Sequence, residues 1–121
     1  MESIYRRSNE QGSFGWLSQR ISGILLLGLL FGHFWVTHYF PGGFVTFEKV
    51  AVRLVLPVWK VFDISLLLAS IFHGLNGIWI IFLDYIHKDW IRITIYAALW
   101  VIGLVFSILG TLVIISFPNH I

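Results

Sequence analysis

Three histidines stand inside or beside long apolar runs of this chain: His33, His38 and His73. Hydrocarbon offers an imidazole no hydrogen bonds, and burial of its charged form is costly, so each needs a partner or a function. Neutral imidazole is a good axial ligand for haem iron, and helical bundles often place such ligands on facing helices. His73 and His33 are therefore candidate haem ligands. The alternative is an imidazole that only hydrogen-bonds a neighbouring helix, and for His38, near a helix end, an ordinary interfacial position.

The surroundings of His73 favour a flat ligand. At 100° per residue, small residues share its side of a helix: Ala69, Ser70, Gly74 and Gly77. They would form a low-walled groove in which a porphyrin can lie, whereas Leu or Phe there would block it.

Asp84 and Tyr85 form a second candidate site. Asp84 follows His73 by eleven residues, so it returns to the same helix face about 16 Å further along. A carboxylate beside a phenol at the membrane surface can bind a quinone carbonyl and relay protons. Arg20 can serve Asp84 as a counter-ion or the quinone as a donor. The alternative is that all three anchor helix ends at headgroup level.

The composition is that of an integral membrane protein. Of the 121 residues, 58% are hydrophobic and 12% charged, and the mean hydropathy is +0.86. About 20 apolar residues span a bilayer core, so three such helices account for most of this chain. It contains no cysteine, which excludes disulfides and iron–sulfur ligation by this subunit. The net charge of +2 is too small to indicate nucleic-acid binding.

We expect an all-α fold with one transmembrane domain, 1–121, whose spanning helices are 17–40, 58–86 and 92–117. Ser18 can cap the first helix, Pro41 ends it, and Pro57 suits the first turn of the second. Residues 1–16 read as a retained cytoplasmic tail rather than a signal peptide. Residues 44–56 suit a short amphipathic segment at the membrane interface.

The distribution of basic residues predicts a cytoplasmic N-terminus. Five basic residues lie in the tail, the entry to the first helix and the loop between the second and third helices. Three lie on the other side: Lys49, Arg53 and Lys60. The absence of a transit-like leader favours a bacterial plasma (inner) membrane.

The pattern H-G-x-x-G followed by D-Y, which spans His73 to Tyr85, resembles the second helix of a known family. These are the haem b membrane-anchor subunits of succinate:quinone oxidoreductase (succinate dehydrogenase, respiratory complex II) and fumarate reductase. The segment QRISGILLLGLLFGH resembles the R-x-S-G opening of the same superfamily, with the later G-H of its two-haem members. The resemblance covers residues 16 to 86.

The resemblance implies roles for individual residues. His73 corresponds to an axial ligand of haem b, and His33 to the ligand of a second, distal haem in two-haem members. Asp84, Tyr85 and Arg20 correspond to the quinone site of single-haem members. It also implies a bundle shared with a second anchor subunit, docked to an iron–sulfur subunit and a flavoprotein of the tricarboxylic acid cycle.

The chain also departs from that family. The family places a serine four residues before the arginine, and here that position is Trp16. Ser18 or Ser22 would have to supply the quinone-binding hydroxyl, or a partner subunit would; we assign Ser22. Features of both anchor subunits of single-haem enzymes are mixed here, which leaves open whether there are one or two haems and whether this subunit holds the quinone site.

The sequence thus predicts a subunit that performs no succinate chemistry itself. It would ligate haem b and carry electrons from the soluble subunits to quinone. Two alternatives stay open. One is a non-catalytic membrane subunit of a transporter or assembly complex, whose histidines only join helices. The other is a haem b anchor of a different dehydrogenase.

Asp84→Asn and Tyr85→Phe should each slow quinone reduction, because each removes a group that can bind the carbonyl or hold a proton. Succinate oxidation by an artificial dye should be spared, since the dye bypasses the membrane site. Parallel assays of the intact complex check this. Equal loss of both activities would instead indicate a role in assembly.

Overall fold

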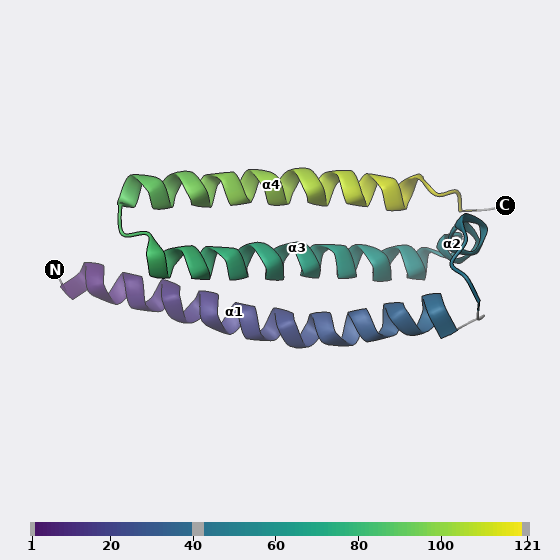
Figure 1. Ribbon diagram of the computed structural model, residues 1–121, viewed down its shortest axis with the longest axis horizontal. Helices are drawn as coiled ribbons and strands as arrows, with labels where there is room; N and C mark the ends of the chain where they lie inside the picture. The colour runs from purple at the N-terminus through teal and green to yellow at the C-terminus, as the bar shows by residue number, and fades with distance from the viewer. Residues whose placement is uncertain (1, 40–42, 120–121) are drawn as a thin grey trace.

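The computed structural model describes residues 2–39 and 43–119, with side chains from residue 12 onward. Its elements are α1 (Glu2–Phe34), the π-helical continuation η1 (Trp35–Tyr39), α2 (Phe47–Leu54), α3 (Pro57–Tyr85) and α4 (Asp89–Ser116) (Figure 1). Three helical stretches are long and apolar enough to cross a membrane: Gly12–Tyr39, Pro57–Tyr85 and Asp89–Ser116. The prediction of an all-α membrane fold with three spanning helices is confirmed.

The largest difference from the predicted boundaries is at α1, which begins at Glu2 instead of Leu17. The polar segment before Leu17 contains no proline, and its two glycines weaken a helix without ending it. Ser18 therefore lies inside the helix, where its Oγ donates to the Phe14 carbonyl at 2.7 Å, so its predicted capping role is wrong. The predicted stop at Pro41 lies outside the described residues.

The predicted segment 44–56 contains the short helix α2. Thr46 caps its start, with Oγ1 accepting from the Lys49 amide at 3.3 Å. Glu48 lies in the first turn and Arg53 in the last, which suits the helix dipole at both ends. Its location at the membrane interface remains a prediction.

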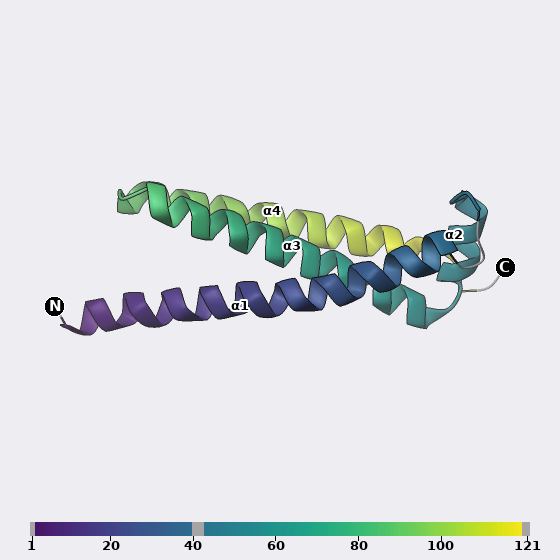
Figure 2. The same ribbon diagram turned by 60° about the horizontal axis from the view of Figure 1, so that its bottom comes forward.

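The three long helices are antiparallel to their neighbours, and α3 lies between α1 and α4 (Figures 1 and 2). Helix α2 lies at the end of the structure where α3 begins. Among the described side chains only Leu54, Ser22 and Lys60 are buried, while large apolar side chains cover the outer faces. Such faces suit lipid or another membrane helix, because in a bilayer an apolar exterior needs no shielding.

Small residues set the packing between α3 and α4. A Cβ added at Gly110 would lie 2.5 Å from Leu67 Cδ2, and one at Gly103 would lie 2.8 Å from Leu75 Cδ1. These two glycines therefore let leucines of α3 approach the α4 backbone. Gly28 has no atom within 4 Å of such a Cβ, so it makes no close helix contact in the described residues.

Two basic side chains satisfy carbonyls at helix ends. Arg92 donates from Nε to the Ile86 carbonyl at 2.5 Å and from Nη2 to the Leu83 carbonyl at 3.1 Å. At the opposite end, Lys60 Nζ donates to the Phe117 carbonyl and to Asn119 Oδ1. These bonds tie α3 to α4 at both ends, where the last carbonyls of a helix lack partners of their own.

Gly110→Val should lower the free energy of unfolding by about 1–3 kcal/mol, because it forces Leu67 away from α4. Denaturant titration of the detergent-solubilised protein, followed by circular dichroism, measures this. Gly28→Val is the matched control, since it adds the same side chain where nothing lies within 4 Å. Equal stability of the two variants would contradict the packing described.

Candidate functional site

His73 of α3 faces α1, where Ser22 holds its ring. Ser22 Oγ lies 3.0 Å from His73 Nδ1, and the same hydroxyl donates to the Gln19 carbonyl at 3.1 Å. Because the hydroxyl proton goes to that carbonyl, the oxygen accepts from Nδ1–H. Ser22 thus selects the tautomer in which Nε2 carries the lone pair, the form that can ligate a metal.

Two amides complete the contact between α1 and α3. Gln19 Nε2 donates to the His73 carbonyl at 3.1 Å and lies 3.4 Å from His73 Nε2. Asn76 Nδ2 donates to Gln19 Oε1 at 2.9 Å and to the Gly15 carbonyl at 3.2 Å. The sequence reasoning missed Gln19 and Asn76, although amides in or near apolar spans are uncommon enough to have signalled a site.

Small residues surround His73, but the predicted groove is divided. A Cβ added at Gly77 would lie 2.8 Å from Gln19 Nε2, and one at Gly23 would lie 3.2 Å from His73 Cε1. A Cβ at Gly74 would meet nothing within 4 Å. The structure therefore differs from the prediction at Gly77, where the Gln19 side chain lies, and agrees with it at Gly74.

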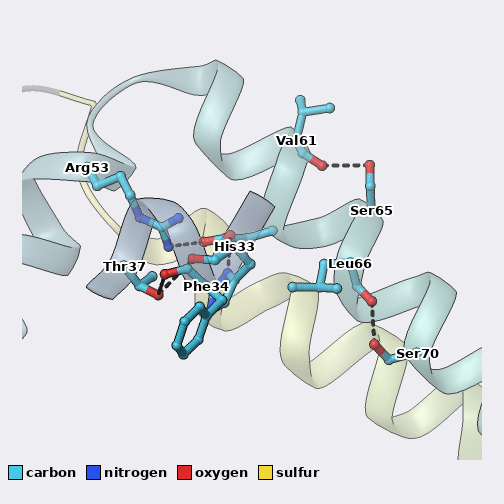
Figure 3. Close-up of polar contacts among 9 residues, drawn as sticks. His33, Phe34, Thr37, Arg53, Val61, Ser65, Leu66 and Ser70 are labelled. Carbon is cyan, nitrogen blue, oxygen red and sulfur yellow. Dashed lines mark hydrogen bonds and ion pairs between the residues drawn. The ribbon is translucent and has the colours of Figure 1, made fainter. Parts of the chain in front are cut away.

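His33 belongs to a second polar cluster that the sequence reasoning did not assemble. Its Nδ1 lies 3.3 Å from Asp63 Oδ1, and Arg53 Nη2 donates to Asp63 Oδ2 at 2.5 Å. Figure 3 shows His33 and Arg53 approaching from different elements. The side chains of Asp63 and Arg53 are each 12% exposed. Asp63 is an acid within a spanning helix, and that position could have signalled a partner.

A cavity of about 530 Å³ adjoins this cluster. Its polar lining comprises His33, Thr37, His38, Arg53, Asp63 and Ser70, and its remaining walls are apolar side chains. Arg53 Nη1 is buried and has no hydrogen-bond partner among the described residues. The volume lies within the range of small-molecule sites, which are mostly apolar with a few polar groups.

The two clusters lie at different depths. Ser22 pairs with His73, and His33, eleven residues further along α1, pairs with Asp63. Eleven residues of helix rise about 16 Å. The two imidazoles of one copy therefore cannot ligate the same iron.

The structure does not bring together the residues of the candidate quinone site, Asp84, Tyr85 and Arg20. Asp84 and Tyr85 end α3, and both are exposed, Tyr85 by 78%. Neither makes a hydrogen bond or ion pair with another side chain that the structure describes. The guanidinium carbon of Arg20 lies 3.9 Å from the centre of the Trp16 ring, and no ion pair with Asp84 occurs in these residues. The structure brings Ser22 to His73 instead.

Both histidines fit an iron that a macrocycle already holds. No group of three or more His, Asp or Glu side chains able to hold a bare ion occurs in the described part of the chain, but haem requires only axial imidazoles from protein. His33 has Nδ1 on a carboxylate and no described partner on Nε2. At His73, Nε2 is the lone-pair nitrogen, and its contact to Gln19 is long enough at 3.4 Å to be weak.

Comparison with known proteins points to membrane subunits. Residues 2–114 match the family described as succinate dehydrogenase/fumarate reductase transmembrane subunit. The succinate dehydrogenase hydrophobic membrane anchor subunit of Archaeoglobus fulgidus is 39% identical over 69 residues, covering 57% of this chain and 59% of that protein. Succinate dehydrogenase 2 membrane subunit SdhC of Mycobacterium tuberculosis is 30% identical over 109 residues, covering 88% of this chain and 76% of that protein.

If His73 ligates haem, as the resemblance implies, Ser22→Ala should weaken retention of that haem by about tenfold, because outer hydrogen bonds that fix a ligand's tautomer typically contribute this much. Haem release from the solubilised complex to excess apomyoglobin measures it. Ser65→Ala is the matched control, since Ser65 Oγ donates to the Val61 carbonyl of its own helix. Equal release by both variants would contradict the role given to Ser22.

Proposed function

Because this chain belongs to the family of succinate dehydrogenase/fumarate reductase transmembrane subunits, we propose that it binds haem b and passes electrons to quinone. The electrons come from an iron–sulfur subunit that is reduced by a flavoprotein. One observation carries the proposal: both candidate ligands, His73 and His33, have Nδ1 against an oxygen acceptor, Ser22 Oγ and Asp63 Oδ1 respectively. That arrangement leaves Nε2 of both rings as the coordinating nitrogen.

His73 ligates the first haem in this proposal. Ser22 holds the ring from α1, and iron at His73 Nε2 would replace the weak 3.4 Å contact between that nitrogen and Gln19 Nε2. The open space at Gly74 admits the macrocycle beside the ring. Bound haem supplies a one-electron centre within the bilayer, and the apolar faces of the helices keep water from it.

His33 ligates a second haem at the other depth. The cavity beside it has polar and apolar walls, as a porphyrin with charged propionates requires. Since His33 and His73 cannot share an iron within one copy, each haem takes its other axial ligand from the second anchor subunit. The proposal is therefore two haems per complex, neither complete without the partner chain.

The quinone site in this proposal lies at the end of α3 that carries Asp84 and Tyr85. Both side chains are exposed there, where a headgroup can meet them and water can supply protons. Asp84 would hold a proton for the reduced ring, and Tyr85 would donate to its carbonyl. Arg20 would add a positive charge to this site once its guanidinium moves from its position over the Trp16 ring. Ser22 we now assign to His73 rather than to quinone.

A cytoplasmic N-terminus in a bacterial plasma membrane completes the proposal. Of the basic residues counted on the opposite side, Arg53 is paired with Asp63 and Lys60 is bound to groups near the C-terminus. Only the Arg53 pair offsets a charge, because the partners of Lys60 are neutral oxygens. The distribution of five basic residues against three, with Arg53 neutralised on the side of three, supports this orientation.

One observation favours the alternative that His73 only joins helices, because both of its ring nitrogens have partners on α1. In that case the chain is a non-catalytic subunit that needs no haem. A colourless complex without a copurifying flavoprotein would support this alternative.

His73→Ala should lose one b-type signal from the reduced absorption spectrum, since it removes the nitrogen that holds the iron. His38→Ala is the control and should keep all signals: His38 lines the cavity beside His33, but its exposed ring lies against Phe34 near the helix end and is not assigned to an iron. Pyridine haemochrome content per protein measures both. Full haem content in a folded His73→Ala complex would overturn the assignment.

A further inference from the structure

The carboxylate of Asp63 bridges two groups, and its two oxygens have different partners. Oδ1 accepts from His33 Nδ1 at 3.3 Å, and Oδ2 accepts from Arg53 Nη2 at 2.5 Å. Asp63 lies on α3, Arg53 on the short helix α2 and His33 on α1. Three elements thus converge on one carboxylate, and two of the side chains involved, His33 and Arg53, are labelled in Figure 3.

An ion pair that served only to join α2 to α3 would not need a carboxylate shared between Arg53 and His33. An arginine and a carboxylate that only joined two helices would favour two parallel hydrogen bonds, whereas Arg53 uses Nη2 and leaves its buried Nη1 without a partner in the described residues. The other carboxylate oxygen is given to the imidazole instead. The geometry is that of a carboxylate that orients a histidine.

We propose that Asp63 is a positioning residue for His33 that sets the reduction potential of the haem bound there, with Arg53 moderating its charge. This inference rests on the proposed ligation by His33. A carboxylate that accepts from Nδ1–H raises the electron-donor strength of Nε2. A stronger donor favours the oxidised iron, so Asp63 lowers the potential and Arg53, which draws charge from Oδ2, raises it.

The two histidines also differ in the group that accepts a hydrogen bond from Nδ1, and so in the donor strength of Nε2. His73 Nδ1 is held by the neutral Ser22 hydroxyl, whereas His33 Nδ1 is held by a charged carboxylate that is 12% exposed. Low exposure keeps the carboxylate's field unscreened by water. His33 is therefore the stronger donor of the two, and the difference originates in residues that do not coordinate the iron.

Asp63→Asn tests the inference in the intact complex, because the amide oxygen can still accept from Nδ1 while the charge is removed. Potentiometric titration of the b-type absorbance should show one of two haems shifted upward, with the other unchanged. We expect about a tenfold change in its reduced-to-oxidised ratio at fixed poise, which is about 59 mV for one electron. Asp89→Asn makes the same change in the exposed first turn of α4 and should shift neither.

Arg53→Gln should move the same haem in the opposite direction, because it leaves the full carboxylate charge on His33. This second variant keeps the inference testable if Asp63→Asn fails to assemble. A purely structural role for the cluster would alter haem content or stability without opposite shifts in potential.

His33→Ala separates the ligation of haem by His33 from the effect of Asp63 on the reduction potential. If this variant keeps both haems, ligation by His33 fails, and the inference about Asp63 falls with it. If it loses one haem, yet Asp63→Asn and Arg53→Gln leave both potentials where they were, ligation stands and only the inference about Asp63 is overturned.

Discussion

The hydrogen bond between Ser22 and His73 is the contact on which the arrangement of α1 and α3 depends. Within a bilayer, polar groups must find partners inside the protein, since lipid offers none. Ser22 is among the few buried side chains of the described structure, and its hydroxyl both accepts from the ring and donates to its own helix. Gln19 and Asn76 extend this contact along the interface. One set of bonds thus holds two spanning helices together and fixes which imidazole nitrogen is basic.

His33 also has a hydrogen-bond partner within the protein, but of a different kind from that of His73. A charged acceptor holds His33, and a cation in turn holds that acceptor. Such a pair has little net charge, which lessens the cost of keeping a carboxylate at a poorly exposed position. In the proposed function, the depth of each histidine places its haem along the route of the electron. The partner of each Nδ1 then helps to set how readily that haem is reduced.

Sequence patterns alone predicted the spanning helices well, because apolar length and proline position determine them directly. Helix α3, predicted as 58–86, is Pro57–Tyr85. Pairings across helices were beyond such reasoning. Asn76 meets Gln19 across 57 residues of sequence, and Asp63 meets His33 across 30; both depend on the rotation and register of packed helices. Periodicity gives each helix its faces but not which faces meet. Hence His73 was found as a candidate, while the amides and the carboxylate around the histidines were missed.

The ratio of haem to flavin in the intact complex tests the central claim most directly. Pyridine haemochrome analysis gives the haem, and release of the flavin gives the number of complexes. Two histidines at different depths, each with Nδ1 held and Nε2 basic, predict two haems per flavin. A ratio of one would contradict the role of His33, and a ratio of zero would contradict haem ligation by this chain altogether.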